Sequence, residues 1–155
     1  MTPPPANSKL GLSPGTLVYV GPEVAKDTTL KLIQYNEEYH EERTVKNLKD
    51  CRISGDKPFI SWLDVDGIHE PEVVEAIGQM HHIHPLLLED VMNTRQKPKI
   101  EFYNDNYVFV SLKMLYWRDK ESEIDAEQVS FFLGSNYVIS FQEKRTGDIF
   151  GPVLD

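Results

Sequence analysis

A short apolar segment bounded by prolines most constrains what this chain can fold into. In the run 84–93, Pro85 suits the first turn of a helix, where a missing N–H costs nothing. Pro98 disfavours a helical conformation at Lys97, so the helix must end well before it. The sequence therefore predicts a short helix over residues 85–93, followed by an extended basic segment.

Two adjacent acids, Glu89 and Asp90, lie near the C-terminus of this predicted helix. At about 100° per residue they share one face with Asn93, and this face offers only oxygen ligands. The helix dipole is negative at this end, so the carboxylates repel each other and the last carbonyls. A hard divalent cation would relieve that repulsion. From spacing alone, a solvated acidic patch paired with Arg95 or Lys99 is the simpler interpretation.

Composition and charge narrow the possible functions. The chain has 155 residues, of which 40% are hydrophobic, which is typical of one folded domain. Its net charge of −9 argues against nucleic acid as a partner, because binding to phosphates needs a basic surface. The single Cys51 cannot form an internal disulfide, which fits a reducing compartment. No apolar run approaches the roughly 20 residues that a membrane-spanning helix needs.

The pattern of apolar residues and turn signals indicates strands in both halves of the chain. Before the helix at 85–93 we expect strands over 16–20, 29–35, 39–47 and 59–65 and a helix that begins at Pro71. After it we expect two hairpins, formed by 100–103 with 107–116 and by 127–133 with 137–142.

These elements predict an α/β (α+β) domain with a mixed β-sheet of about six to seven strands, its faces covered by helices. Residues 1–13 are rich in proline and polar residues, and we expect a disordered tail there. Residues 14–155 are then a single domain.

Several segments, in this order, resemble the N-terminal cytoplasmic domain of the CorA family of magnesium and cobalt transporters. They are 14–19 (PGTLVY), 62–69 (WLDVDGIH), 83–85 (IHP) with 88–90 (LED), 127–130 (EQVS) and 141–144 (FQEK). The resemblance covers most of the chain.

The resemblance implies a function. Members of the family place a cation-sensing carboxylate where Asp90 stands, facing the stalk helix of a neighbouring subunit in a homopentamer, and Glu89 is implicated more weakly in a second site. The chain is then a regulatory domain at the cytoplasmic face of the cell membrane. It would bind Mg²⁺ as regulatory ligand and transported ion, with Co²⁺ as an alternative, and the bound ion would favour the closed channel. The stalk and transmembrane helices that would follow are absent from this chain, so we expect a soluble fragment.

Other groups receive structural interpretations. His81, His82 and His84 suggest a transition metal, but adjacent helical residues point about 100° apart, so we expect no closed zinc site. His84 is interpreted as the residue that begins the helix. Relatives often carry glycine in the place of His82, which costs stability here if the backbone needs a positive φ. The scattered basic residues are interpreted as ordinary surface charge; they are Arg95, Lys97, Lys99, Lys113 and Lys144.

Two alternatives remain open at this stage. A relative within the same family would transport zinc or nickel, and a protein of another class would be a free-standing α/β ligand-binding domain. An enzyme is not expected, because no nucleophile motif and no phosphate-binding glycine-rich loop occurs in the sequence.

Overall fold

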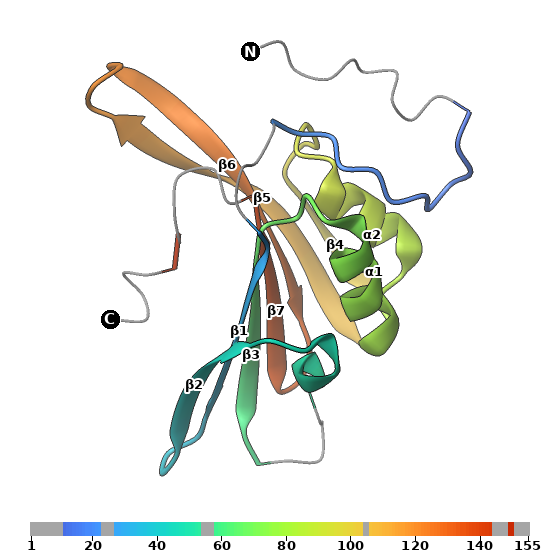
Figure 1. Cartoon of the computed structure of the whole chain (residues 1–155), viewed down its shortest axis with the longest axis vertical. Helices are drawn as coiled ribbons and strands as arrows, with labels where there is room; N and C mark the ends of the chain where they lie inside the picture. Colours follow the sequence, from blue (N-terminus) through green and yellow to red (C-terminus); the bar gives the residue numbers. More distant parts are fainter. Residues whose placement is uncertain (1–10, 23–26, 54–57, 104–105, 144–148, 151–155) are drawn as a thin grey trace.

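The computed structural model describes residues 11–22, 27–53, 58–103, 106–143 and 149–150. These residues form a seven-stranded mixed sheet, and two α-helices lie over one of its faces (Figure 1). The strands are β1 (Thr29–Tyr35), β2 (His40–Val45), β3 (Ile60–Asp66), β4 (Lys99–Tyr103), β5 (Tyr107–Arg118), β6 (Glu123–Leu133) and β7 (Tyr137–Gln142). The helices are η1 (Leu48–Cys51, a 3-10 helix), α1 (Pro71–Met80) and α2 (Pro85–Met92). The predicted α+β class with a mixed sheet is confirmed, but the α-helices of the described residues cover one face of the sheet and not both.

The strand order is β2-β1-β3-β7-β6-β5-β4. Only β3 and β7 pair in parallel, and all the other neighbours are antiparallel. Neighbours such as β4 and β5 are joined by short connections, which suit antiparallel pairing, whereas β3 and β7 are separated by both α-helices and three strands. The sheet therefore consists of two antiparallel halves joined at β3 and β7.

The hydrophobic core lies between the helices and the inner face of the sheet. The sheet contributes Leu63, Ile139, Phe109 and Phe132, and the helices contribute Val74, Ile77, Leu87, Leu88 and Val91. All of these side chains are buried. Burial of one such side chain is worth roughly 1.5–3 kcal/mol, so this layer fixes how α2 lies on the sheet.

The strand predicted over 16–20 is wrong. Only Val20 pairs, in an isolated bridge to Asn93, and residues 16–19 form no regular element. The N–H of Val20 donates to the Met92 carbonyl at 2.9 Å, and its carbonyl accepts from the Thr94 N–H at 3.0 Å. Leu17 and Tyr19 of this segment pack against the hydrophobic core. β-Branched content favours a strand, but it cannot tell whether a sheet edge is available.

The other predicted elements are present, with longer strands in the second half. The hairpin of β5 and β6 continues to Arg118 and Glu123, beyond the predicted limits. Its outer part carries exposed apolar residues such as Trp117 and Ile124, so burial does not impose a one-sided pattern there. The short helix η1 was not predicted either. The predicted tail falls largely on 1–10, and the turn of the first hairpin largely on 104–105, both outside the described residues.

The face of the sheet opposite the helices is only partly covered. Phe150 packs there against Trp62 and Phe131, with ring centroids 5.1 and 5.8 Å away. At the β4 edge, Ile100 and Phe102 point to this face and are exposed. Within the described part of the chain, no helix has the length and apolar character required to cross a membrane.

Candidate functional site

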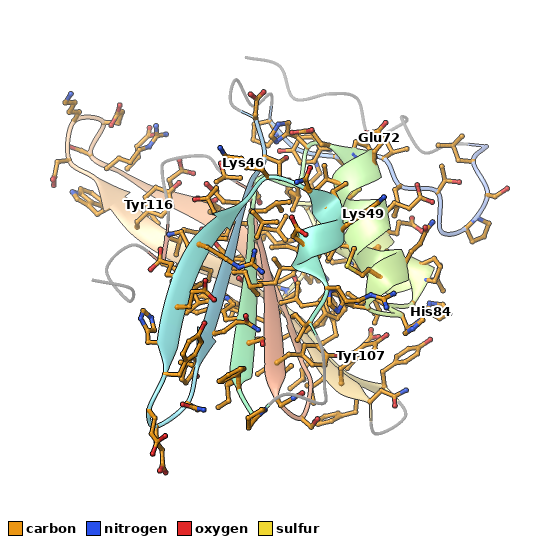
Figure 2. All side chains as sticks on the ribbon, turned by 60° about the horizontal axis from the view of Figure 1, so that its bottom comes forward. Lys46, Lys49, Glu72, His84, Tyr107 and Tyr116 are labelled. Atoms are coloured by element: carbon orange, nitrogen blue, oxygen red, sulfur yellow. The ribbon has the colours of Figure 1, made fainter. Side chains whose placement is uncertain are left out.

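Helix α2 begins at a well-defined cap. Pro85 is its first residue, and the His84 Nδ1 atom accepts a hydrogen bond from the Leu86 N–H at 3.2 Å. The backbone N–H of His84 donates to the Tyr107 hydroxyl at 3.1 Å, and Figure 2 shows these two residues close together at one end of the sheet. The helix-starting role predicted for His84 is confirmed, and β5 fixes this end of α2.

The other end of α2 is held by the buried side chain of Gln128. Its Nε2 atom donates to the carbonyls of Asp90, at 3.2 Å, and Val91, at 3.1 Å. The backbone N–H of Gln128 in turn donates to Glu143 Oε1 at 2.8 Å. The last carbonyls of a helix lack i+4 partners within the helix, so this amide gives the Val91 carbonyl a donor and the Asp90 carbonyl a second one beside the Asn93 N–H. The position of Asp90 is therefore set by β6 as well as by its own helix.

Lys113 is not ordinary surface charge, which corrects the prediction for this residue. Its side chain is 26% exposed, and its ammonium donates to the Thr94 carbonyl and to Gln128 Oε1 at 3.3 Å. It also lies 4.0 Å from Glu143 Oε1. The register of β5 and β6 places Lys113 opposite Gln128, and its bond to Thr94 lies two residues past the end of α2. A cation at the negative end of a helix is favourable, so the repulsion predicted there is already reduced. Lys144 lies outside the described residues.

Asp90 is half-buried, and both of its carboxylate oxygens are in use. Oδ2 lies 2.5 Å from the ammonium of Lys99, and Oδ1 accepts a hydrogen bond from Gln96 Nε2. Lys99 is the first residue of β4, so the ion pair joins the helix to an edge strand. The pairing of Asp90 with Lys99, which the sequence offered as the simpler interpretation, is present.

Glu89 is directed to a different neighbour. Its Oε2 atom accepts a hydrogen bond from the backbone N–H of Gly15 at 3.1 Å. Gly15 has φ +84, and a Cβ there would lie 3.3 Å from the Cβ of Pro85, so glycine suits this close approach. The two candidate carboxylates therefore have separate partners within one chain: Glu89 holds the N-terminal segment and Asp90 holds β4.

Glu101 is a neighbour of Asp90 that sequence reasoning missed. Its Oε1 atom lies 2.7 Å from the ammonium of Lys99, which therefore bridges two carboxylates. Partial burial disfavours the charged form of Lys99, but its hydrogen bonds to Asp90 and Glu101 outweigh this effect and raise its pKa. The alternation of 99 and 101 along a strand put both residues on one face, but nothing in the sequence placed that face against α2.

His81, like His84, has a hydrogen-bond partner within the fold. His81 Nε2 lies 3.1 Å from the Cys51 carbonyl oxygen, and since a carbonyl only accepts, this nitrogen carries the proton. Burial lowers the pKa of His81. His82 has φ 55, a conformation that favours glycine, the residue that relatives often carry at this place. In the part of the chain that the structure describes, no three His, Cys, Asp or Glu residues are grouped to hold a metal ion.

Comparison with known proteins identifies the family. Residues 59–149 match the model of the CorA family, described as CorA-like Mg²⁺ transporter protein. The chain is 40% identical over 149 residues to the cobalt/magnesium transport protein CorA of Thermotoga maritima, covering 96% of this chain and 42% of that protein. It is 32% identical over 111 residues to YfjQ of Bacillus subtilis, covering 70% and 32% respectively. The chain thus spans less than half the length of these curated relatives.

A solved structure supports the fold. The full-length CmaX protein superposes with a TM-score of 0.59 at 12% identity, over 77% of this chain and 36% of that one. At this identity the likeness concerns the fold alone. The match over residues 59–149 and the 40% identity to the Thermotoga protein show that this chain belongs to the CorA family of transporter proteins.

Proposed function

We propose that this chain is the divalent-cation-sensing domain of a CorA-like magnesium transporter. The observation that carries the proposal is the half-buried carboxylate of Asp90, held at the end of α2 in a family whose Thermotoga member is named a cobalt/magnesium transport protein. Its oxygen donors suit Mg²⁺, which keeps several waters and needs only one or two carboxylates from the protein. Mg²⁺ is thus the regulatory ligand and the transported ion, with Co²⁺ as the alternative cargo.

The rest of the transporter lies outside this chain. We propose that the described sheet and helices form one domain, that a stalk and membrane helices follow it in the intact protein, and that the assembly is a homopentamer. The domain then lies at the cytoplasmic face of the membrane, and a carboxylate from a neighbouring subunit completes the site at Asp90. The length of the Thermotoga relative, of which this chain matches 42%, supports this arrangement.

Bound Mg²⁺ would neutralise facing carboxylates and so favour the packed, closed arrangement of subunits. A sensor of cellular Mg²⁺ must release it near millimolar concentration, which corresponds to about −4 kcal/mol per site. One such site shifts a conformational equilibrium only modestly, so repetition of the site around the assembly gives the control. Glu89 would contribute to a second, weaker site, because its carboxylate must first give up the Gly15 N–H.

Zinc or nickel as cargo is the less favoured alternative. Imidazole would be the expected ligand for these ions. The ring nitrogens of His81 and His84 that contact Cys51 and Leu86 already serve the fold.

The first test is a Mg²⁺ titration of this chain followed by amide NMR. We expect chemical-shift changes at millimolar Mg²⁺, clustered at residues 89–93. They should be lost in Asp90→Asn and kept in Glu72→Gln, which removes an equal charge from an exposed position on α1. In the full-length transporter, Asp90→Asn should weaken the closure of the channel by Mg²⁺. Transport with unchanged Mg²⁺ sensitivity in that variant would refute the sensing role.

A further inference from the structure

The ammonium of Lys99 occupies the position where a cation would meet Asp90. It lies 2.5 Å from Asp90 Oδ2 and 2.7 Å from Glu101 Oε1. Lys99 and Glu101 alternate along β4, so both point to the face of the sheet on which α2 lies. The ammonium is also 5.5 Å from the centre of the Phe109 ring, a contact that favours a cation there.

The other two oxygens of Asp90 also have hydrogen-bond partners. Oδ1 accepts from Gln96 Nε2, and the backbone carbonyl accepts from Gln128 Nε2. The Gln128 amide is buried and also holds Val91, so it is the less exchangeable of the two. The ammonium of Lys99 stands at the end of a flexible side chain that is 26% exposed, so it can swing into solvent.

The charges at this point favour an exchange of cations. Asp90 and Glu101 carry two negative charges, and Lys99 supplies one positive charge, so the group keeps one excess negative charge. Departure of Lys99 leaves two carboxylates whose oxygens both lay within hydrogen-bond distance of one atom. That spacing suits a hydrated Mg²⁺ ion, which is commonly bound through one or two carboxylates.

We propose that Lys99 is a built-in competitor for the cation at Asp90, and that Glu101 is the second carboxylate that the ion meets when Lys99 leaves. This inference rests on the proposed cation site, and it explains how one chain keeps that site weak. Binding of Mg²⁺ then requires release of an ion pair, so the affinity is set within the chain, before any subunit contact is made.

The test is the Mg²⁺ affinity of Lys99→Met, measured by the same amide NMR titration. Methionine keeps an unbranched apolar stem over Phe109 and removes the charge. Loss of this partly exposed bridging ion pair should lower the dissociation constant for Mg²⁺ about three- to tenfold. The matched control is Lys97→Met, which removes the same charge from an exposed neighbour and should change the constant less than about twofold.

A second variant tests Glu101 without interference from Lys99. In the Lys99→Met background, Glu101→Gln should weaken Mg²⁺ binding again, to the affinity of the unmodified chain or below it. Equal affinities for the single and double variants would overturn the role of Glu101. The resonances of residues 99–101 should shift together with those of 89–93.

The outcomes separate this inference from the proposed function. If Asp90→Asn abolishes binding while Lys99→Met leaves the affinity unchanged or weaker, competition is overturned and the cation site stands. Equal tightening in Lys99→Met and Lys97→Met would also overturn it, because only the overall charge would then matter. Binding seen only after removal of Lys99 supports the competition. Absence of localised shifts in both the unmodified chain and Lys99→Met overturns both proposals.

Discussion

Replacement of His82 by glycine should stabilise the protein. His82 follows the C-cap of α1 with φ 55, the left-handed conformation in which a Cβ is crowded. The N–H of His82 bonds the Gln79 carbonyl at 3.4 Å, and the N–H of Ile83 bonds the Gly78 carbonyl at 2.9 Å. These two hydrogen bonds form a Schellman motif, which requires the left-handed residue at this position.

The expected gain is the difference between two opposing terms. A left-handed conformation costs an ordinary L-residue about 1–2 kcal/mol, and glycine escapes that strain. Glycine loses more backbone entropy on folding, which returns roughly 0.5–1 kcal/mol. The imidazole of His82 is exposed, so its removal sacrifices little packing. The free energy of unfolding should therefore rise by about 0.5–1 kcal/mol, which raises the melting temperature of a chain of this size by about 1–4 °C.

Urea denaturation, followed by circular dichroism, measures this change. The matched control is His82→Ala, which removes the imidazole but keeps the Cβ, and it should show no comparable gain. Ser122, with φ 52 in the turn between β5 and β6, offers an independent repeat as Ser122→Gly. Equal stabilities of the glycine and alanine variants at His82 would refute the reasoning, because the Cβ would then carry no strain.

Two further predictions concern buried polar groups. Gln128→Ala should lower the free energy of unfolding by roughly 1–3 kcal/mol, because the Val91 carbonyl loses the Gln128 amide and the Asp90 carbonyl keeps only the Asn93 N–H. Faster hydrogen exchange in the last turn of α2 would accompany it, and unchanged exchange would contradict the capping role. Burial lowers the pKa of His81, so the unfolded chain binds more protons below about pH 6.5 and stability should fall as the pH drops through that value. His81→Gln should flatten this part of a urea-midpoint profile against pH; an unchanged slope would assign it to other groups.

Local signals in the sequence determined most of the elements. Pro71 and Pro85 mark helix starts because a proline fixes φ and needs no N–H partner there, and both stand at the first position of a helix. Alternating apolar residues located β1 and β3, which are buried on the helix side. The segment 16–20 is also rich in β-branched and aromatic residues but pairs only at Val20, because whether a strand forms depends on a neighbouring strand with free backbone groups.

The same distinction between local pattern and tertiary contact applies to the candidate site. The local pattern drew attention to Glu89 and Asp90 as a pair of acids at the end of an apolar helix, but it was the resemblance to the CorA family that made them candidate cation ligands. Only the tertiary structure decided their partners: Lys99 and Glu101 reach Asp90 because β4 lies beside α2, while Gly15 reaches Glu89 from a distant part of the chain. These contacts join residues up to 74 positions apart. Helical periodicity relates only residues within a few positions of each other, so it cannot determine which distant charges share one carboxylate; strand order and register determine that.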